Sequence, residues 1–360
     1  MSEGVVQFEA RGGAEARVAY CRAGTGPAVV LIHGVGLQKA IWAPQMEALV
    51  ADHDVVAMDM PGHGGSSWPP EAPTLPDYSD AVLALLDGLG IERATVVGHS
   101  MGALVALEFA LAHPERTAGV VAVNAVFCRT SAQRAAIAAR VDELKGGQNL
   151  PDWSGTLARW FGSPVPAHLA AAAEHTKALL GDIDPVGYTR TYRLFAEADA
   201  EHGGRLAQLT VPALFVTGAE DPNSTPAMSD AMARLAPKGR LVVMPEVRHM
   251  LPLTHVEAFN GELRGFLAAT ADAPPAAPVD PRAFRRALGG FLTGITVVAT
   301  VQPDGTPRGF TANSFTSVSL DPPLILICIA KTASSCPVFS AAEGFSVNIL
   351  AEHQVSVSGL

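Results

Sequence analysis

The sequence predicts an α/β fold, in which helices cover both faces of a doubly wound, mostly parallel sheet. Four short runs of aliphatic and β-branched residues are separated by amphipathic stretches, at residues 29–32, 55–58, 94–97 and 120–123. Each run is apolar at almost every position, as expected for a strand that is covered on both faces. Two similar runs return at 213–216 and 241–244, and a closing helix is expected near 256–269. Alternating strands and helices of this kind predict a single layered domain.

Composition excludes several classes of protein. The chain of 360 residues is 48% hydrophobic and 17% charged, which indicates a folded globular protein. Its formal net charge of −10, without clusters of Lys and Arg, argues against a nucleic-acid or membrane partner. No apolar stretch reaches the roughly 18 residues of a membrane span, and the first residues lack a signal pattern, so we expect a cytoplasmic location. The four cysteines lack the spacing of a zinc site, so we expect no metal.

The chain divides into three parts by sequence pattern. Residues 1–270 form the predicted α/β domain, and an Ala-rich, aromatic-rich stretch at about 127–208 predicts a helical lid inserted over the sheet. Residues 271–281 are rich in Ala and Pro and predict a linker, because Pro interrupts both helices and strands. Residues 282–360 form a shorter, mainly β unit with strands expected at 291–301 and 323–329.

The most informative segment is residues 98–102, with the sequence GHSMG, which lies between a predicted strand and a helix-like stretch at 103–112. This is the G-x-S-x-G pattern in its strand–turn–helix context. A serine on so tight a turn has strained backbone angles, and the flanking glycines avoid collisions with neighbouring elements. The pattern predicts that Ser100 is a nucleophile.

Two backbone N–H groups are expected to bind the oxyanion. Residues 33–36, with the sequence HGVG, directly follow the first predicted strand, and Met101 begins the helix after Ser100. Peptide N–H groups at such positions stabilise negative charge on a substrate oxygen. The sequence therefore predicts an oxyanion hole formed by Val35 and Met101.

The expected base and acid follow the serine in chain order. Asp221 lies just past the predicted strand at 213–216, and His249 follows the strand at 241–244. A neutral imidazole accepts the serine proton when its other nitrogen donates to a fixed acceptor, which is the role expected of Asp221. Glu220 is the rival acid. Surface or packing roles suffice for His63 and for His99, and also for His255, which we expect on the closing helix.

These segments, together with residues 59–66 (DMPGHGGS), resemble the α/β-hydrolase family from about residue 18 to residue 269. The resemblance implies a serine hydrolase that cleaves an ester, lactone, amide or enamide bond of a small metabolite. Members with an aspartate nucleophile, such as haloalkane dehalogenases and epoxide hydrolases, are disfavoured because Ser100 occupies that position. A carbon–carbon bond hydrolase and a general carboxylesterase use the same three side chains and stay open.

A carboxylate-bearing substrate would require cations near Ser100. The candidate substrate-binding residues are Arg248, beside His249, together with Trp160 and Arg190 of the predicted lid. Further candidate cations are Arg129, Arg159 and Arg193. For each of these five arginines a solvated surface charge is the simpler explanation.

The segment after the linker resembles the flavin reductases of two-component monooxygenases. The run at 311–317 (TANSFTS) carries the resemblance, which implies FMN or FAD binding by small polar side chains and backbone N–H groups. The positions that match are Thr311, Asn313, Ser314, Ser317, Lys331 and Ser334.

Only the N-terminal half of such a reductase is present. An incomplete β-barrel has open sheet edges and cannot enclose a cofactor, so we expect either association with another chain, such as a second copy, or disorder. We therefore do not expect this segment to reduce flavin. The hydrolase itself would need no cofactor.

The fusion favours a functional link to a flavin monooxygenase, with the hydrolase acting on a ring-cleavage product of an aromatic or N-heterocyclic compound. Two other functions stay open: a bifunctional hydrolase and flavin reductase, and a ligand-binding protein without turnover.

Overall fold

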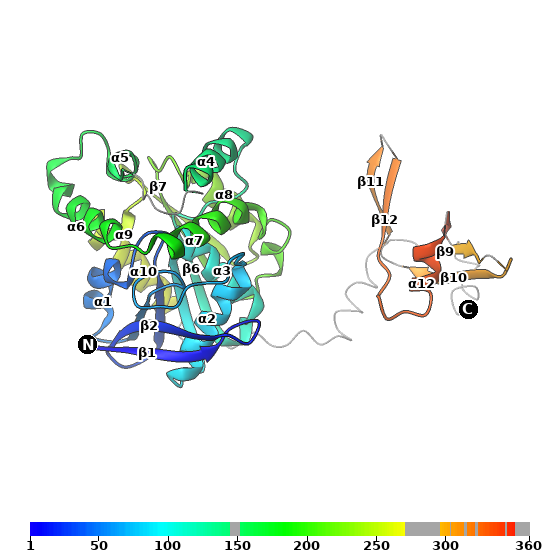
Figure 1. Ribbon diagram of the computed structural model, residues 1–360, viewed down its shortest axis with the longest axis horizontal. Helices are drawn as coiled ribbons and strands as arrows, with labels where there is room; N and C mark the ends of the chain where they lie inside the picture. The colour runs from blue at the N-terminus through cyan, green and yellow to red at the C-terminus, as the bar shows by residue number, and fades with distance from the viewer. Residues whose placement is uncertain are drawn as a thin grey trace. The chain divides into compact units, whose positions relative to one another are not determined.

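The computed structural model describes residues 1–144, 152–270, 296–302, 304–312, 315–320, 323–342 and 344–349 (Figure 1). Contacts between Cα atoms divide the chain into two compact units, residues 1–277 and 278–360. The predicted linker at 271–281 lies outside the described residues.

The first unit is built on an eight-stranded sheet with the strand order β1-β2-β4-β3-β5-β6-β7-β8. Six strands, from β4 to β8 in this order, run parallel, as the sequence predicts. Strands β1 and β2 form an antiparallel hairpin that the sequence analysis missed, because exposed polar residues interrupt its apolar pattern. The strands are Ser2–Glu9 (β1), Glu15–Ala23 (β2), Ala28–Ile32 (β3), Asp54–Met58 (β4), Ala94–His99 (β5), Thr117–Val123 (β6), Ala213–Gly218 (β7) and Gly239–Met244 (β8).

The central strands are buried on both faces, which explains their continuous apolar runs. In β3, Val30 and Ile32 pack into one core cluster while Val29 and Leu31 pack into the other. Helices α2, α3 and α8 cover the first face, and α1, α9 and α10 cover the second (Figure 1). Their bounds are Ala43–Leu49 (α1), Leu75–Gly88 (α2), Met101–Ala112 (α3), Pro226–Leu235 (α8), Leu251–Thr254 (α9) and Val256–Thr270 (α10).

A helical insertion connects β6 to β7 and lies over the carboxyl ends of the parallel strands (Figure 1). We use the name helical insertion for α4 to α7. These helices are Ser131–Leu144 (α4), Ser154–Phe161 (α5), Ala170–Gly181 (α6) and Pro185–Glu197 (α7). The insertion occupies the region in which the sequence predicts helices and no strands.

The second unit contains a three-stranded sheet, a separate hairpin and a short helix. The sheet has the order β10-β9-β13, and the hairpin pairs β11 with β12. The strand expected at 291–301 is described only from Thr296, and the strand expected at 323–329 ends at Ile327. The other three strands were not predicted. The elements are Thr296–Val301 (β9), Pro307–Ala312 (β10), Phe315–Leu320 (β11), Pro323–Ile327 (β12), Cys336–Ala341 (α12) and Ser346–Ile349 (β13).

Within the described part of the chain, no helix has the length and apolar character that a membrane span requires.

Candidate active site

Ser100 lies at the tight turn between β5 and α3. Its backbone angles, φ 56° and ψ −116°, place it in a region that L-residues rarely adopt. The flanking glycines are required by space, since a side chain at Gly98 would collide with the carbonyl group of Gly102, and one at Gly102 with that of Ile32. The turn therefore holds the serine hydroxyl out of the sheet, at the N-terminus of α3.

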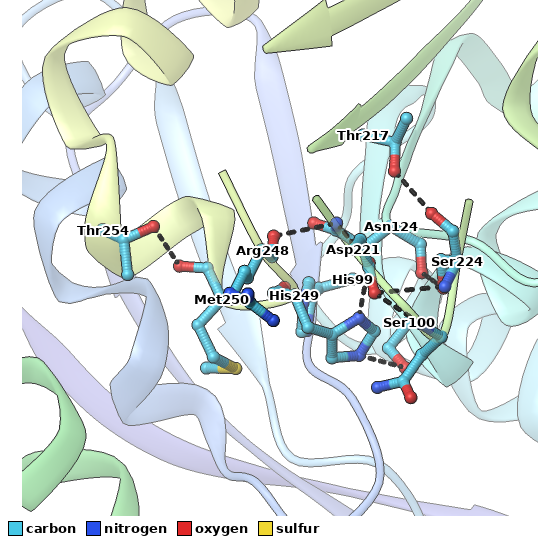
Figure 2. A network of polar contacts seen from close by, with 11 residues as sticks. His99, Ser100, Asn124, Thr217, Asp221, Ser224, Arg248, His249, Met250 and Thr254 are labelled. Atoms are coloured by element: carbon cyan, nitrogen blue, oxygen red, sulfur yellow. Dashed lines mark hydrogen bonds and ion pairs between the residues drawn. The ribbon is translucent and has the colours of Figure 1, made fainter. Parts of the chain in front are cut away.

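The structure brings Ser100, His249 and Asp221 together from three separate loops (Figure 2). The Ser100 hydroxyl lies 3.2 Å from Nε2 of His249, and Nδ1 of His249 lies 2.8 Å from Oδ2 of Asp221. Each of these residues is at most 6% exposed. The arrangement has the hydrogen-bonded order of nucleophile, base and orienting acid.

Asp221 is held in its ionised form by several donors. Its Oδ1 accepts hydrogen bonds from the N–H groups of Asn223 (2.8 Å) and Ser224 (3.1 Å). Burial alone would raise the pKa of Asp221, but the neighbouring His249 and these N–H groups hold that pKa below its ordinary value. A charged carboxylate suits the task of stabilising an imidazolium on His249.

Asn124 is a residue of this network that the sequence analysis missed. Its Nδ2 donates to Oδ2 of Asp221 over 2.7 Å, and its backbone carbonyl accepts from the Ser224 hydroxyl at 2.6 Å (Figure 2). Asn124 has a φ of 49°, which asparagine tolerates better than most residues. The signal in the sequence was its position directly after β6, because the carboxyl ends of parallel strands meet at one edge of the sheet.

Glu220, the rival acid, lies apart from His249. Its side chain is about half exposed, and it pairs with Arg248 over 3.5 Å.

His99 is buried and donates through Nε2 to the carbonyl oxygen of His249 at 2.8 Å. Burial lowers the pKa of His99 to about 3, so this imidazole is neutral. The expectation for His255 was wrong, because it lies between α9 and α10 rather than on the closing helix.

The two expected oxyanion donors belong to the two segments next to Ser100. Met101 is the first residue of α3, where a backbone N–H has no acceptor within the helix. Val35 lines the same pocket as Ser100 and belongs to a segment that packs against the serine, since a side chain at Gly34 would lie 3.1 Å from Cβ of Ser100.

A pocket of about 440 Å³ opens above Ser100 and His249. The helical insertion supplies most of its walls, with aromatic and polar side chains from α4, α5 and α7 and the apolar Leu180 from α6. Trp160 belongs to this lining, and its ring centre lies 5.5 Å from that of His249. The aromatic side chains that line the pocket are Trp153, Trp160, Tyr188, Tyr192 and Phe195.

Three arginines line this pocket: Arg129, Arg140 and Arg159. Arg129 and Arg159 are among the cations expected from the sequence, whereas Arg140, which lies on α4 with no motif around it, was not predicted. The two arginines expected to bind substrate, Arg190 and Arg248, lie elsewhere. Arg190 donates to the carbonyl oxygen of Pro69 at 2.7 Å, and Arg248 pairs with Glu220, so neither belongs to the pocket lining.

The expected flavin positions are only partly described. Asn313 and Ser314 lie outside the described residues, and for Ser317 the backbone in β11 is described without its side chain. Thr311, Lys331 and Ser334 are exposed, and the Ser334 hydroxyl accepts from Arg308 at 3.0 Å. Within the described part of the second unit, these side chains form no buried cradle for a flavin.

Comparisons with known proteins divide the chain in the same way. Residues 27–176 match the alpha/beta hydrolase fold family, and residues 288–360 match the flavin reductase like domain. The (E)-2-((N-methylformamido)methylene)succinate hydrolase of Acinetobacter baylyi is 35% identical over 251 residues, which are 70% of this chain and 94% of that protein. An esterase structure from Thermogutta terrifontis, with malate bound, has a TM-score of 0.68 at 25% identity and covers 75% of this chain and 100% of its own.

The final part is similar to reductase components. The reductase component of the flavin-dependent trigonelline monooxygenase of Acinetobacter baylyi is 58% identical over 79 residues, which are 22% of this chain and 26% of that protein. The chain thus spans between 25% and 43% of the length of several such reductases that it matches. Taken with the fold, these matches show that the chain belongs to the α/β-hydrolase fold family, as a hydrolase of small metabolites that carries a partial flavin reductase-like segment.

Proposed function

We propose that this protein hydrolyses the amide bond of a small N-acyl enamine that carries two carboxylates, with Ser100 as the nucleophile. The observation that carries the proposal is that Ser100, Arg140 and Arg159 line one pocket. The name of the Acinetobacter baylyi relative describes a substrate of this class, a succinate with an N-acylated aminomethylene group.

The charges of the pocket favour a dianion. Arg140 and Arg159 both reach the Thr156 hydroxyl, with nitrogen to oxygen distances of 3.5 and 3.1 Å, so their guanidinium groups lie close together. Two cations at such a distance repel each other unless anions lie between them. Glu143 also lines the pocket, 3.9 Å from Arg140, but its side chain is 68% exposed and solvent screens its charge.

Arg129 adds a third, more deeply buried cation. Its guanidinium group lies 3.4 Å from Asp199 and 4.4 Å above the ring of Phe195, and its side chain is 3% exposed. Because Asp199 balances this charge, Arg140 and Arg159 are the cations that a substrate carboxylate would neutralise.

In the first half-reaction, the Ser100 hydroxyl attacks the acyl carbon while Nε2 of His249 takes its proton. The carbonyl oxygen becomes an oxyanion, which the N–H groups of Val35 and Met101 stabilise. Asp221 remains charged and stabilises the imidazolium. The C–N bond then breaks as His249 returns the proton to the departing nitrogen, which leaves an acyl group on Ser100 and releases an enamine.

In the second half-reaction, a water molecule gives a proton to His249 and attacks the acyl group. The ester bond to Ser100 breaks, the serine recovers its proton, and a carboxylic acid leaves. Conjugation of the departing nitrogen with a carboxylate-bearing double bond disperses its electron pair, which makes such a nitrogen a better leaving group than that of an ordinary amide.

Esters and enol-lactones are the second candidate class. The similarity to an esterase structure favours them, and the same steps apply with an oxygen as the leaving atom.

The flavin reductase-like segment favours a substrate that a flavin monooxygenase produces by opening a ring. Association of two copies through the open strands of the second unit stays a prediction.

The test is hydrolysis of a panel by the full chain and by Ser100→Ala. The panel contains N-formyl and N-acetyl aminomethylene succinates, their mono- and diesters, enol-lactones and p-nitrophenyl esters. We expect the dicarboxylate enamides to have the highest kcat/KM, and Ser100→Ala to lower turnover by on the order of 10³- to 10⁶-fold.

Ser2→Ala, at an exposed serine of β1, serves as the matched control and is expected to retain full activity. A wild-type protein that is inert across the whole panel, yet is stabilised against unfolding by a dicarboxylate enamide, would identify a binding protein instead. A preference for neutral esters would overturn the assignment of substrate class.

A further inference from the structure

Two buried imidazoles connect residues 33–36, which contain Val35, to residues 59–66. Nε2 of His63 accepts a hydrogen bond from the backbone N–H of Gly36 at 3.0 Å. Nε2 of His33 accepts from the backbone N–H of Met60 at 2.9 Å. The two rings meet edge to face with their centres 5.1 Å apart, and both side chains are at most 1% exposed.

Both imidazoles are neutral and each has a fixed tautomer. Burial lowers the pKa of His33, and it lowers the pKa of His63 to about 3. Nδ1 of His63 faces the carbonyl oxygen of Pro61 at 3.3 Å, and Nδ1 of His33 faces that of Gly34 at 2.7 Å. A neutral imidazole has one donor and one acceptor nitrogen, so in each ring Nδ1 donates and Nε2 is left to accept.

Contacts of Asp59 hold the other end of the loop that begins at residue 33, near Lys39. The carboxylate of Asp59 accepts from the backbone N–H of Lys39 at 2.8 Å and pairs with its ammonium group at 2.9 Å. The same carboxylate accepts from the N–H of Gly65 at 3.1 Å. Residues 59–66 therefore hold the loop that begins at residue 33 at both of its ends.

The loop that begins at residue 33 packs tightly against the turn at Ser100. Gly34 packs so closely on the turn that a Cβ there would lie 3.1 Å from both Cβ of Ser100 and Nδ1 of His99. Gly36, at φ 77°, turns the chain away directly after Val35. The direction of the Val35 N–H group thus depends on how Gly36 is held.

We propose that His63 is a positioning residue for hydrolysis, because its Nε2 holds the Gly36 N–H and so aims the Val35 N–H at the position of the oxyanion. The inference rests on the proposed function, since it assigns Val35 to the oxyanion hole. His63 itself touches neither the substrate nor the reacting atoms; it acts through the loop. An oxyanion donor contributes only when it already points at the developing charge, so a small displacement costs transition-state stabilisation without weakening substrate binding.

The experiment compares His63→Leu with His63→Gln in the full chain, using the best substrate of the panel. Leucine has a similar volume but no acceptor for the Gly36 N–H, whereas the side-chain oxygen of glutamine reaches the position of Nε2. We expect His63→Leu to lower kcat by roughly 10- to 100-fold, with KM changed less than about threefold. We expect His63→Gln to recover most of the loss.

A boronic acid provides a second readout, because it forms a tetrahedral adduct with a nucleophilic serine. Its inhibition constant is expected to rise in His63→Leu by the same factor by which kcat falls, while inhibition by the dicarboxylate product stays within about threefold of wild type. Thermal unfolding of each variant verifies that it is folded. If His63→Leu does not fold, His63→Asn replaces it, because its shorter amide cannot reach the Gly36 N–H.

The outcomes separate this inference from the proposed function. A wild-type protein that hydrolyses nothing in the panel contradicts the function. An active wild type whose folded His63→Leu variant keeps its kcat overturns the role of His63, as does an equal loss of kcat in the leucine and glutamine variants.

Discussion

Nδ2 of Asn124 lies 2.7 Å from Oδ2 of Asp221, the same oxygen that accepts from Nδ1 of His249 at 2.8 Å (Figure 2). The two donors approach one oxygen from different sides, so Asn124 fixes the rotation of the carboxylate as well as its charge. A hydrogen bond to a charged group contributes about 1.5–3 kcal/mol.

Replacement of Asn124 by glycine tests this relationship. Glycine adopts the φ of 49° without strain, so the variant removes the side-chain donor and leaves the backbone conformation unchanged. We expect kcat to fall by roughly tenfold and KM to change little, because a less well-held Asp221 orients His249 less well. Steady-state kinetics and urea unfolding measure the two effects. A lower unfolding midpoint with an unchanged kcat would assign Asn124 a structural role only.

The arginines of the pocket are expected to select the charge of the substrate. Arg140→Ala and Arg159→Ala should each lower kcat/KM for the dicarboxylate enamide by about tenfold or more, and for a neutral p-nitrophenyl ester by less than about threefold. Arg240→Ala, at an exposed arginine that pairs with Glu262, is the control for loss of a cation. Equal losses on charged and neutral substrates would contradict a role in carboxylate recognition.

A close contact between Gly187 of α7 and Gly62 is expected to limit how the helical insertion packs on the domain. A Cβ at Gly187 would collide with the carbonyl oxygen of Gly62, whereas one at Gly181 of α6 meets no atom within 4 Å. We expect Gly187→Ala to destabilise the protein by roughly 1–3 kcal/mol. Gly181→Ala, by contrast, should be neutral or stabilising by up to about 1 kcal/mol. Denaturant unfolding of the two matched variants measures this difference, and similar midpoints would contradict it.

The buried Glu108 of α3 forms a cluster with the buried His202 and the partly exposed Arg205, which both follow α7 in the chain. The carboxylate lies 3.1 Å from Nε2 of His202 and 2.6 Å from Nη1 of Arg205. Burial alone would raise the pKa of Glu108, but these two partners lower that pKa to about 2. Because the pKa is lower in the folded state than in the unfolded state, the cluster stabilises the fold above about pH 4.5. Its contribution is lost as the pH falls toward 2.

Glu108→Gln is therefore expected to lower the free energy of unfolding at pH 7 by on the order of 3 kcal/mol. The difference from wild type should shrink between about pH 4.5 and pH 2. Glu115→Gln, at an exposed carboxylate, is the control. Unfolding measured by denaturant at several pH values checks the prediction, and a difference that is independent of pH would contradict it.

The parallel sheet and the positions of Ser100, Asp221 and His249 follow from local sequence. Strands that are buried on both faces are apolar throughout, and the first turns after parallel strands meet at one edge of the sheet. A serine, an acid and a histidine in the loops that follow three parallel strands are therefore expected to lie close together. In the structure, 3.2 Å separate Ser100 from His249 and 2.8 Å separate His249 from Asp221.

The β1–β2 hairpin could not be predicted in this way. Its strands lie at the margin of the sheet with one face toward solvent, so alternating polar residues hide the pattern. The strands β10, β11 and β13 were missed for a related reason, because polar residues interrupt the apolar run of each. Strands β10 and β11 pair with their neighbours along the chain, β9 and β12, whereas β13 pairs with β9, which is distant in sequence.

The sequence by itself determined which strands form the parallel part of the sheet and which residues follow their ends, because burial and the tight turn at Ser100 restrict the amino acids allowed there. Only the tertiary structure decided which cations reach the pocket and which side chains hold the loop at Val35. Arg140 enters the pocket and Arg190 does not because the rotation of each inserted helix is set by its packing against distant segments. His63 meets Gly36 for the same reason, as the two belong to different loops and no local pattern joins them.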